Sequence, residues 1–219
     1  MQKLVQGIHR FQRNIFSSQR ELFERLAGGQ NPDALFITCS DSRINPNLIT
    51  QTEPGELFII RNAGNIIPPY AFSGSGEGAA IEFAVVGLGV KDIIVCGHSL
   101  CGAMKGLLDP KSLDGLPLMS EWLRHAESTR WVIREKYEGL DLEAKLNVTI
   151  QENVLRQLEN LRTHPSVAAG ISSGTLKLHG WVYKIESGDV FAFDPDSEQF
   201  SPIAEVKAPP ARVLSTHTM

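Results

Sequence analysis

The sequence predicts an α/β fold: a mainly parallel central sheet flanked by helices, with an N-terminal helical arm and a C-terminal edge hairpin. Two observations lead to this prediction. Short apolar runs typical of buried strands occur at residues 34–39, 57–61 and 92–96. Segments whose apolar residues recur at helical spacing lie before, between and after these runs. Strands that alternate with helices in this way build parallel sheets.

The predicted elements follow in order along the chain. Residues 1–29 form an amphipathic helical pattern that ends at Gly28-Gly29. Further helices are predicted over residues 76–89, 102–108, 118–137 and 142–162. Residues 176–185 alternate between apolar and polar as a strand does, and a turn at Ser187-Gly-Asp189 leads into 190–193. This pattern predicts a hairpin at the edge of the sheet.

Composition and charge narrow the classes of function. The chain has 219 residues, 42% of them hydrophobic and 21% charged, which is ordinary for a globular domain with a buried core. A net charge of -4 gives no reason to expect nucleic acid or an anionic membrane as a partner. No apolar run approaches the ~20 residues of a membrane span. Three cysteines are too few for a disulfide scaffold. We therefore expect a cytoplasmic protein.

Two compact motifs contain the residues with metal-binding chemistry. Cys39 ends the first predicted strand, while His98 and Cys101 follow the third. Because open α/β folds place their sites at the carboxyl edge of the sheet, these three side chains can converge there. Two thiolates and one imidazole suit zinc better than magnesium or calcium, and three protein ligands leave a fourth position open. The sequence therefore predicts one Zn²⁺ per chain in a catalytic site.

Asp41 and Arg43 strengthen the catalytic interpretation over a purely structural zinc or a set of core thiols. Side chains two residues apart in an extended segment point the same way, so Arg43 can reach the Asp41 carboxylate. Asp41 could take the fourth metal position itself or lie just outside it. Outside it, the carboxylate can orient a zinc-bound hydroxide, since zinc lowers the pKa of bound water from about 15.7 to about 7. Cys96 lies within an apolar strand and is predicted to be a core residue.

Three motifs resemble those of the β-class carbonic anhydrases: Cys39-Ser-Asp-Ser-Arg43, Arg61-Asn-Ala-Gly-Asn65 and Cys96-Gly-His-Ser-Leu-Cys-Gly102. The similarity runs from the N-terminal helix to about residue 200. The resemblance implies reversible hydration of carbon dioxide to bicarbonate by zinc-bound hydroxide, with the cysteines and histidine above as ligands. It also implies that Asp41 and Arg43 form the catalytic dyad.

The same resemblance implies a set of substrate-binding residues. Gln30 and the backbone amide of Gly102 would contact carbon dioxide or bicarbonate. Phe58, Ala63 and Phe83 fall at the positions of the family's apolar pocket, which suits a nonpolar gas. The family often has Tyr at the position of Phe83, so any role of that hydroxyl is absent here. The chain then divides into a helical arm (1–30), a zinc-binding α/β catalytic domain (31–200) and a C-terminal tail (201–219).

A finer resemblance is to the cyanobacterial carboxysomal members of the family. It is carried by Gln2-Lys-Leu-Val-Gln-Gly7, Phe16-Ser-Ser18, Leu48-Ile-Thr-Gln51 and Ala103-Met-Lys-Gly-Leu-Leu108. Bacterial members associated with cyanate breakdown share much of this pattern. The carboxysomal reading implies a role in carbon fixation, as a supplier of inorganic carbon within a carboxysome, and contact with carboxysome scaffold proteins.

Other functions remain open from the sequence alone. One is hydrolysis of carbon disulfide or carbonyl sulfide, which similar sites can perform. Another is a non-catalytic, zinc-stabilised component of an assembly. The helical arm has more apolar residues than a free surface helix needs, and members of the family build the active site across a dimer. We therefore expect a homodimer or higher homo-oligomer, with Gln30 and Phe58 near the interface.

Some family members are inhibited by bicarbonate at a second site built from Trp, Arg and Tyr. Here Arg61 and Tyr183 match that pattern, but Phe36 stands at the Trp position and lacks an indole N–H donor. Thr38 replaces the adjacent glycine, and its branched side chain should fill space that the anion needs. We expect this second site to be non-functional. His164 is predicted to lie at the surface.

Overall fold

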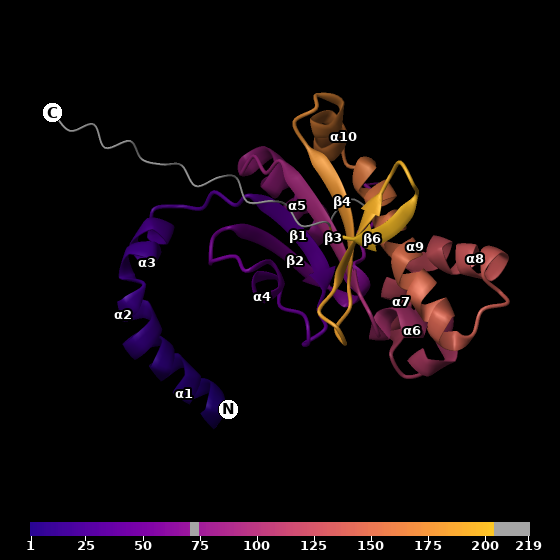
Figure 1. Cartoon of the computed structure of the whole chain (residues 1–219), viewed down its shortest axis with the longest axis horizontal. Coiled ribbons are helices and arrows are strands. Elements are labelled where there is room, and N and C mark those ends of the chain that lie inside the picture. Colours follow the sequence, from indigo (N-terminus) through magenta and orange to yellow (C-terminus); the bar gives the residue numbers. More distant parts are fainter. Residues whose placement is uncertain (71–74, 204–219) are drawn as a thin grey trace.

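A computed structural model describes residues 1–70 and 75–203 of the chain. Within these residues one six-stranded sheet has the order β2-β1-β3-β4-β5-β6 (Figure 1). The strands are β1 (Ala34–Cys39), β2 (Leu57–Asn62), β3 (Asp92–His98), β4 (Lys177–Tyr183), β5 (Val190–Asp194) and β6 (Gln199–Pro202). The first four in spatial order are parallel, and β5 and β6 continue antiparallel at the edge. This arrangement confirms the predicted fold class and its edge hairpin.

The helices that follow the N-terminal arm connect and cover these strands. They are α4 (Pro46–Thr50), α5 (Gly76–Glu82), α6 (Gly102–Leu108), α7 (Pro117–Leu123), α8 (Glu127–Lys136), α9 (Leu142–Arg162) and α10 (Pro165–Ser172). A single helix over residues 118–137 was a wrong prediction, because a 3₁₀ turn at Arg124–Ala126 separates α7 from α8. The start of α9 is fixed by Asp141, whose Oδ1 accepts a 2.8 Å hydrogen bond from the Ala144 amide.

The N-terminal arm projects away from the body of the molecule (Figure 1). It consists of α1 (Gln2–Arg10), a π-helical segment (Phe11–Ile15), α2 (Phe16–Ser18) and α3 (Arg20–Ala27). No residue of these four segments is buried. Most of its apolar side chains are therefore exposed, although Leu26 at its end lies close to Gly55. At the other end, the predicted tail lies outside the described residues from position 204 onward.

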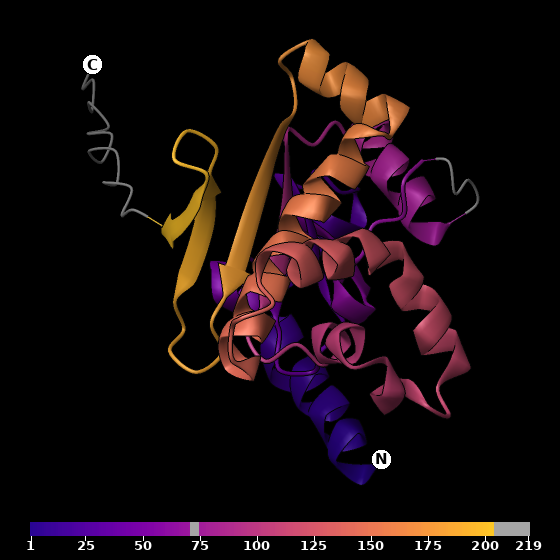
Figure 2. The ribbon, with the colours of Figure 1, turned by 90° about the vertical axis from the view of Figure 1, so that its right-hand side faces the viewer.

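The helices from α5 to α10 gather on one side of the sheet (Figure 2), where α9 packs against β3 and β4. Gly97 permits this close packing, because a Cβ atom there would lie 2.9 Å from Val154 Cγ2. A smaller core cluster, which includes Phe36 and the predicted core residue Cys96, is centred on alternate residues of β1 and β3. Contrary to the prediction, His164 is buried, and its Nε2 lies 3.1 Å from the Pro68 carbonyl oxygen.

Within the described residues, no helix has the length and apolar character needed to cross a membrane.

Candidate metal centre

The parallel pairing of β1 with β3 brings the predicted ligands together. Cys39 is the last residue of β1 and His98 the last of β3, so both lie at the carboxyl edge of the sheet. Cys101 follows three residues later and is the N-cap residue of α6. The ligand atoms of these three residues lie within 4.8 Å of one another, and all three residues are buried. The structure therefore assembles the set that strand order and spacing predicted.

The histidine ring is oriented for a metal ion. His98 Nδ1 lies 2.8 Å from the carbonyl oxygen of Ser99. A carbonyl can only accept, so Nδ1 carries the proton and Nε2 of the neutral ring has a free lone pair. Nε2 is buried without a hydrogen-bond partner. Such an atom is costly unless it binds something, and a metal ion beside two sulfurs would satisfy it.

The sulfur atoms of Cys39 and Cys101 are close enough to shift each other's pKa. A hydrogen bond from Cys101 lowers the pKa of Cys39 to about 4, and the Gly64 amide contributes further. The pKa of Cys101 is raised, because the Cys39 thiolate holds its proton and burial disfavours its charge. A divalent cation in place of that proton would stabilise both thiolates. The donor set of two soft sulfurs and one imidazole fits zinc.

Asp41 is held by Arg43 next to this set. Arg43 Nε and Nη2 donate to the two carboxylate oxygens at 2.9 and 2.7 Å, and the Arg43 amide donates to Oδ1 at 3.0 Å. These hydrogen bonds keep the pKa of Asp41 well below its usual range. Asp41 Oδ2 lies 3.9 Å from His98 Nε2, so the ionised carboxylate faces the ligand set.

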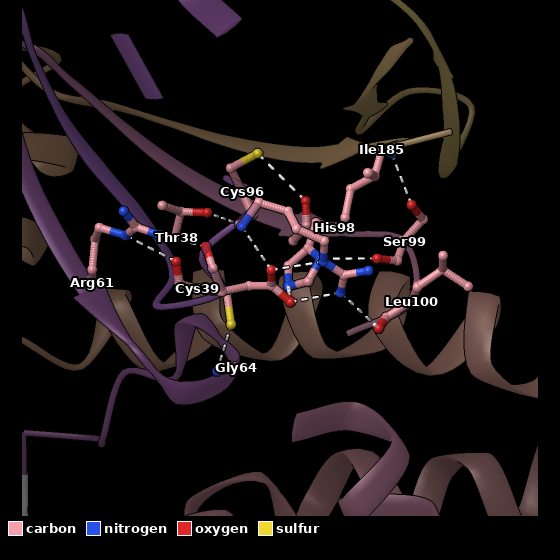
Figure 3. Close-up of polar contacts among 12 residues, drawn as sticks. Thr38, Cys39, Arg61, Gly64, Cys96, His98, Ser99, Leu100 and Ile185 are labelled. Atoms are coloured by element: carbon pink, nitrogen blue, oxygen red, sulfur yellow. Dashed lines mark hydrogen bonds and ion pairs between the residues drawn. The ribbon is translucent and has the colours of Figure 1, made fainter. Parts of the chain in front are cut away.

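Arg61 braces the loop that connects these residues. Its Nε donates to the Cys39 carbonyl oxygen at 3.1 Å and its Nη2 to the Asp41 carbonyl oxygen at 2.7 Å. In this structure the Arg61 guanidinium is therefore engaged by the backbone. Nearby, the buried Thr38 hydroxyl donates to the Cys96 carbonyl oxygen at 2.9 Å (Figure 3).

A tight turn supports the sulfur of Cys39 from the other side. The amide of Gly64 donates to Cys39 Sγ at 3.3 Å (Figure 3). Gly64 has a φ of +81°, a conformation that favours glycine. Its carbonyl oxygen accepts a 3.0 Å hydrogen bond from Asn153 Nδ2 of α9. The same helix face continues with Gln157, which accepts from the Ile67 amide at 2.8 Å.

The predicted substrate-binding residues are only partly brought together in this chain. Phe58 and Phe83 are in contact, with ring centroids 6.0 Å apart. Ala63 directly precedes the turn at Gly64, and its carbonyl oxygen accepts from Trp122 Nε1 at 2.8 Å. Other predicted contacts involve exposed positions: Gly102 at the start of α6 and Gln30 between α3 and β1.

Sequence reasoning missed several residues that support the site. Ser99 and Glu186 form a 2.5 Å hydrogen bond that joins the loop after β3 to the turn after β4. The buried polar face of α9, with Asn153 and Gln157, resembles an ordinary solvated helix face in sequence. No local pattern marks these contacts, because each joins segments that are about 90 residues apart.

Fold and site together define an α/β protein with a buried group of two cysteines and one histidine that could hold a metal ion at the carboxyl edge of its sheet. The carbonic anhydrase family model matches residues 34–190. A carbonic anhydrase from Synechocystis sp. is 54% identical over 195 residues, which are 89% of this chain and 71% of that protein. A carbonic anhydrase from Pseudomonas aeruginosa is 50% identical over 205 residues, which are 94% of this chain and 93% of that protein.

Solved structures agree with this result. The β-carbonic anhydrase CcaA matches with a TM-score of 0.91 and 53% identity, over 92% of this chain and 98% of that chain. A tetrameric β-carbonic anhydrase from Sordaria macrospora matches with a TM-score of 0.80 and 30% identity, over 87% of this chain and 95% of that chain. The chain belongs to the β-class carbonic anhydrase family. It is a carbonic anhydrase, which interconverts carbon dioxide and bicarbonate, and the predicted resemblance is confirmed.

Proposed function

We propose that Cys39, His98 and Cys101 hold one Zn²⁺ per chain, and that carbon dioxide is hydrated at this ion. The observation that carries the proposal is the buried, unpartnered Nε2 of His98 beside two sulfurs, with all three ligand atoms within 4.8 Å. When bound, zinc supplies a Lewis acid that lowers the pKa of water towards about 7.

The Asp41–Arg43 pair is proposed to orient the reacting water. Arg43 holds both carboxylate oxygens of Asp41, which keeps the group ionised and therefore an acceptor only. Since Oδ2 faces the ligand set, it can accept a hydrogen bond from a water molecule held there. That hydrogen bond would orient the water molecule. Its O–H would point at Asp41 Oδ2, and a lone pair of its oxygen would point toward the substrate.

The substrate is proposed to lie against apolar residues, of which Ala63 adjoins the turn beside Cys39 in this chain, whereas Phe58 pairs with Leu35, four residues before Cys39 on β1. Phe58, Phe83 and Ala63 offer nonpolar surface, which suits carbon dioxide and binds no competing water strongly. The amide of Gly102 is at the positive end of α6, where the developing charge of bicarbonate would be stabilised. Gln30 lies at an exposed position after the arm, and its proposed contact with bicarbonate would be made in the oligomer.

Zinc content and stopped-flow hydration of carbon dioxide test the proposal together. Cys39→Ser and His98→Ala should lose metal and activity in parallel, because each removes one of three ligands. Cys96→Ala is the matched control, since Cys96 is also a buried thiol but belongs to the second core cluster. Full zinc content in Cys101→Ser would contradict the ligand assignment.

Carbon disulfide is the competing substrate to be measured alongside carbon dioxide. Rates on both substrates should favour carbon dioxide, as expected for a chain of this family. A zinc-loaded protein that turns over neither substrate would instead indicate a non-catalytic assembly component.

The proposed assembly is a homodimer or higher homo-oligomer. The arm exposes Leu4, Ile8 and Phe11 with 66%, 56% and 41% of their surface accessible, more apolar area than a solvated helix tolerates well. One relative of known structure is described as tetrameric. Analytical ultracentrifugation should show no monomer at micromolar concentration, and a fully active monomer would contradict this proposal.

The proposed location is the cytoplasm, within a carboxysome, where the enzyme would supply inorganic carbon for fixation. The support is the motif resemblance together with the identity to a cyanobacterial carbonic anhydrase. The identity to a Pseudomonas aeruginosa carbonic anhydrase is nearly as high, so the sequence supports a different bacterial role equally well. Co-purification with carboxysome scaffold proteins, after co-expression, should succeed. Failure to co-purify, with scaffold assembly intact, would favour the other role.

A further inference from the structure

The hydroxyl of Ser99 connects the metal-site loop to the turn after β4. Ser99 is 1% exposed, and its Oγ donates to Glu186 Oε2 at 2.5 Å. The same oxygen accepts from the Ile185 amide at 2.9 Å (Figure 3). The Ser99 amide also donates to the Tyr183 carbonyl oxygen at 2.9 Å. Both the side chain and the backbone of Ser99 are therefore fixed to residues 183–186.

The fixed backbone of Ser99 sets the direction of the histidine ligand. Its carbonyl oxygen accepts from His98 Nδ1 at 2.8 Å, so the orientation of this peptide group determines both the tautomer and the ring plane. Rotation of the 99–100 peptide would remove the acceptor and release the ring. The ligand atom Nε2 would then lose its direction toward the two sulfurs.

The next residue shows why this loop needs an anchor. Leu100 has a φ of +59°, in the left-handed region that side chains with a Cβ rarely adopt. A strained conformation persists only where the surroundings hold it in place. The Leu100 carbonyl oxygen receives only a long 3.4 Å hydrogen bond from Arg43 Nη2. The short hydrogen bond between Ser99 and Glu186 is the stronger restraint on this loop, because its acceptor is charged.

We infer that Glu186 is a positioning residue of the metal centre, which holds Ser99 so that the His98 imidazole stays directed at the ion. Glu186 is itself exposed at the surface, and within residues 1–70 and 75–203 its side chain bonds Ser99 and none of the three ligands. The inference rests on the proposed zinc site. It assigns to a surface carboxylate of the turn after β4 a part in metal affinity.

Zinc affinity of the full-length protein, measured by competition with a chromophoric chelator, tests the inference. Glu186→Ala should weaken zinc binding by about 10-fold, the lower end of the range found when a direct partner of a ligand is removed, because Glu186 acts one residue further out, through Ser99. Glu186→Gln should retain affinity closer to wild type, because the amide oxygen still accepts from Ser99. An equal loss of zinc affinity in the two variants would assign the effect to the charge of Glu186 alone and would overturn the inference.

A matched control lies in the same turn. Asp189 is exposed, and its carboxylate accepts from the Ser187 hydroxyl at 2.6 Å instead of from the metal-site loop. Asp189→Ala should leave zinc affinity unchanged. Affinity lost equally in Asp189→Ala, or retained in Glu186→Ala, would overturn the inference.

Nitrogen NMR of the metal-free protein supplies a second readout. His98 should be a single Nδ1–H tautomer in the wild type and a mixture of tautomers in Glu186→Ala, because the Ser99 carbonyl then moves. An unchanged tautomer in the variant would contradict the mechanism. Failure of the zinc site itself is distinguishable, since a wild-type chain that binds no zinc tightly would overturn both proposals.

Discussion

Replacement of Gly64 by Ala tests how much stability is lost when a Cβ atom is added to the turn beside Cys39. The φ of Gly64 is +81°, and a Cβ atom would lie 3.0 Å from Ala103 Cβ and 3.0 Å from Met104 Cε. Met104 can move its terminal methyl, but the Ala103 Cβ is fixed by its backbone. The left-handed conformation costs about 1–2 kcal/mol for a residue with a Cβ, and overpacking costs about 1–3 kcal/mol. We expect the free energy of unfolding to fall by about 2–5 kcal/mol.

Urea denaturation of the metal-free protein, followed by circular dichroism, gives this free energy. Gly115→Ala is the matched control, because Gly115 has a φ of +87° but no atom within 4 Å of the added Cβ. The free energy of unfolding of the control should fall only by the cost of the left-handed conformation, about 1–2 kcal/mol. The reasoning is refuted if the two variants are destabilised equally. Gly64→Ala should also bind zinc more weakly, since its amide moves away from Cys39 Sγ.

Three further outcomes are expected. Arg43→Ala should reduce kcat/KM for hydration on the order of 100-fold at full zinc content, because Asp41 is no longer held as an acceptor. Unchanged kinetics would contradict the proposed role of the Asp41–Arg43 pair. Chelation of zinc should lower the melting temperature of the wild type but leave that of Cys39→Ser unmoved, because only ligand that binds the folded state stabilises it. Bicarbonate should inhibit with a Hill coefficient of about 1, since Phe36 and Thr38 stand where the second site would form; cooperative inhibition would show that the site works.

Much of the fold and the ligand set can be predicted from the sequence, for a physical reason. Buried parallel strands appear as short apolar runs, and their carboxyl ends meet at one edge, so Cys39 and His98 are placed by strand order alone. The contact of Asp41 with Arg43 was predicted for an extended segment, but the chain turns at residues 42–43, where the Arg43 amide also donates to Asp41 Oδ1. Local rules could not place the contacts of Ser99 with Glu186, because these depend on how distant segments meet.

The misread elements have similar causes. The break between α7 and α8 is a short 3₁₀ turn at Arg124–Ala126, within a segment whose apolar spacing continues as in a helix. His164 looks like a loop residue before a proline, yet tertiary packing buries it against the Pro68 carbonyl. Polar residues on the inner face of α9 look solvated for the same reason. Their burial depends on the backbone of residues 64–67, which presents groups for them to bind.

That inner face of α9 gives a final prediction. Asn153 and Gln157 are buried one helical turn apart, and Gln157 Nε2 donates to Asn153 Oδ1 at 2.9 Å while Asn153 Nδ2 donates to the Gly64 carbonyl oxygen at 3.0 Å. Asn153→Ala leaves two buried polar groups without partners, which should cost about 2–6 kcal/mol at about 1–3 kcal/mol for each. Thr149→Val is the control on the same buried face, because the Thr149 hydroxyl donates only to the Lys145 carbonyl oxygen within the helix at 2.7 Å. If α9 positions the turn at Gly64, Asn153→Ala should weaken zinc binding as well as stability, whereas Thr149→Val should affect neither strongly. Chelator competition on both variants decides this, and wild-type zinc affinity in a destabilised Asn153→Ala protein would show that the network stabilises the fold without acting on the metal centre.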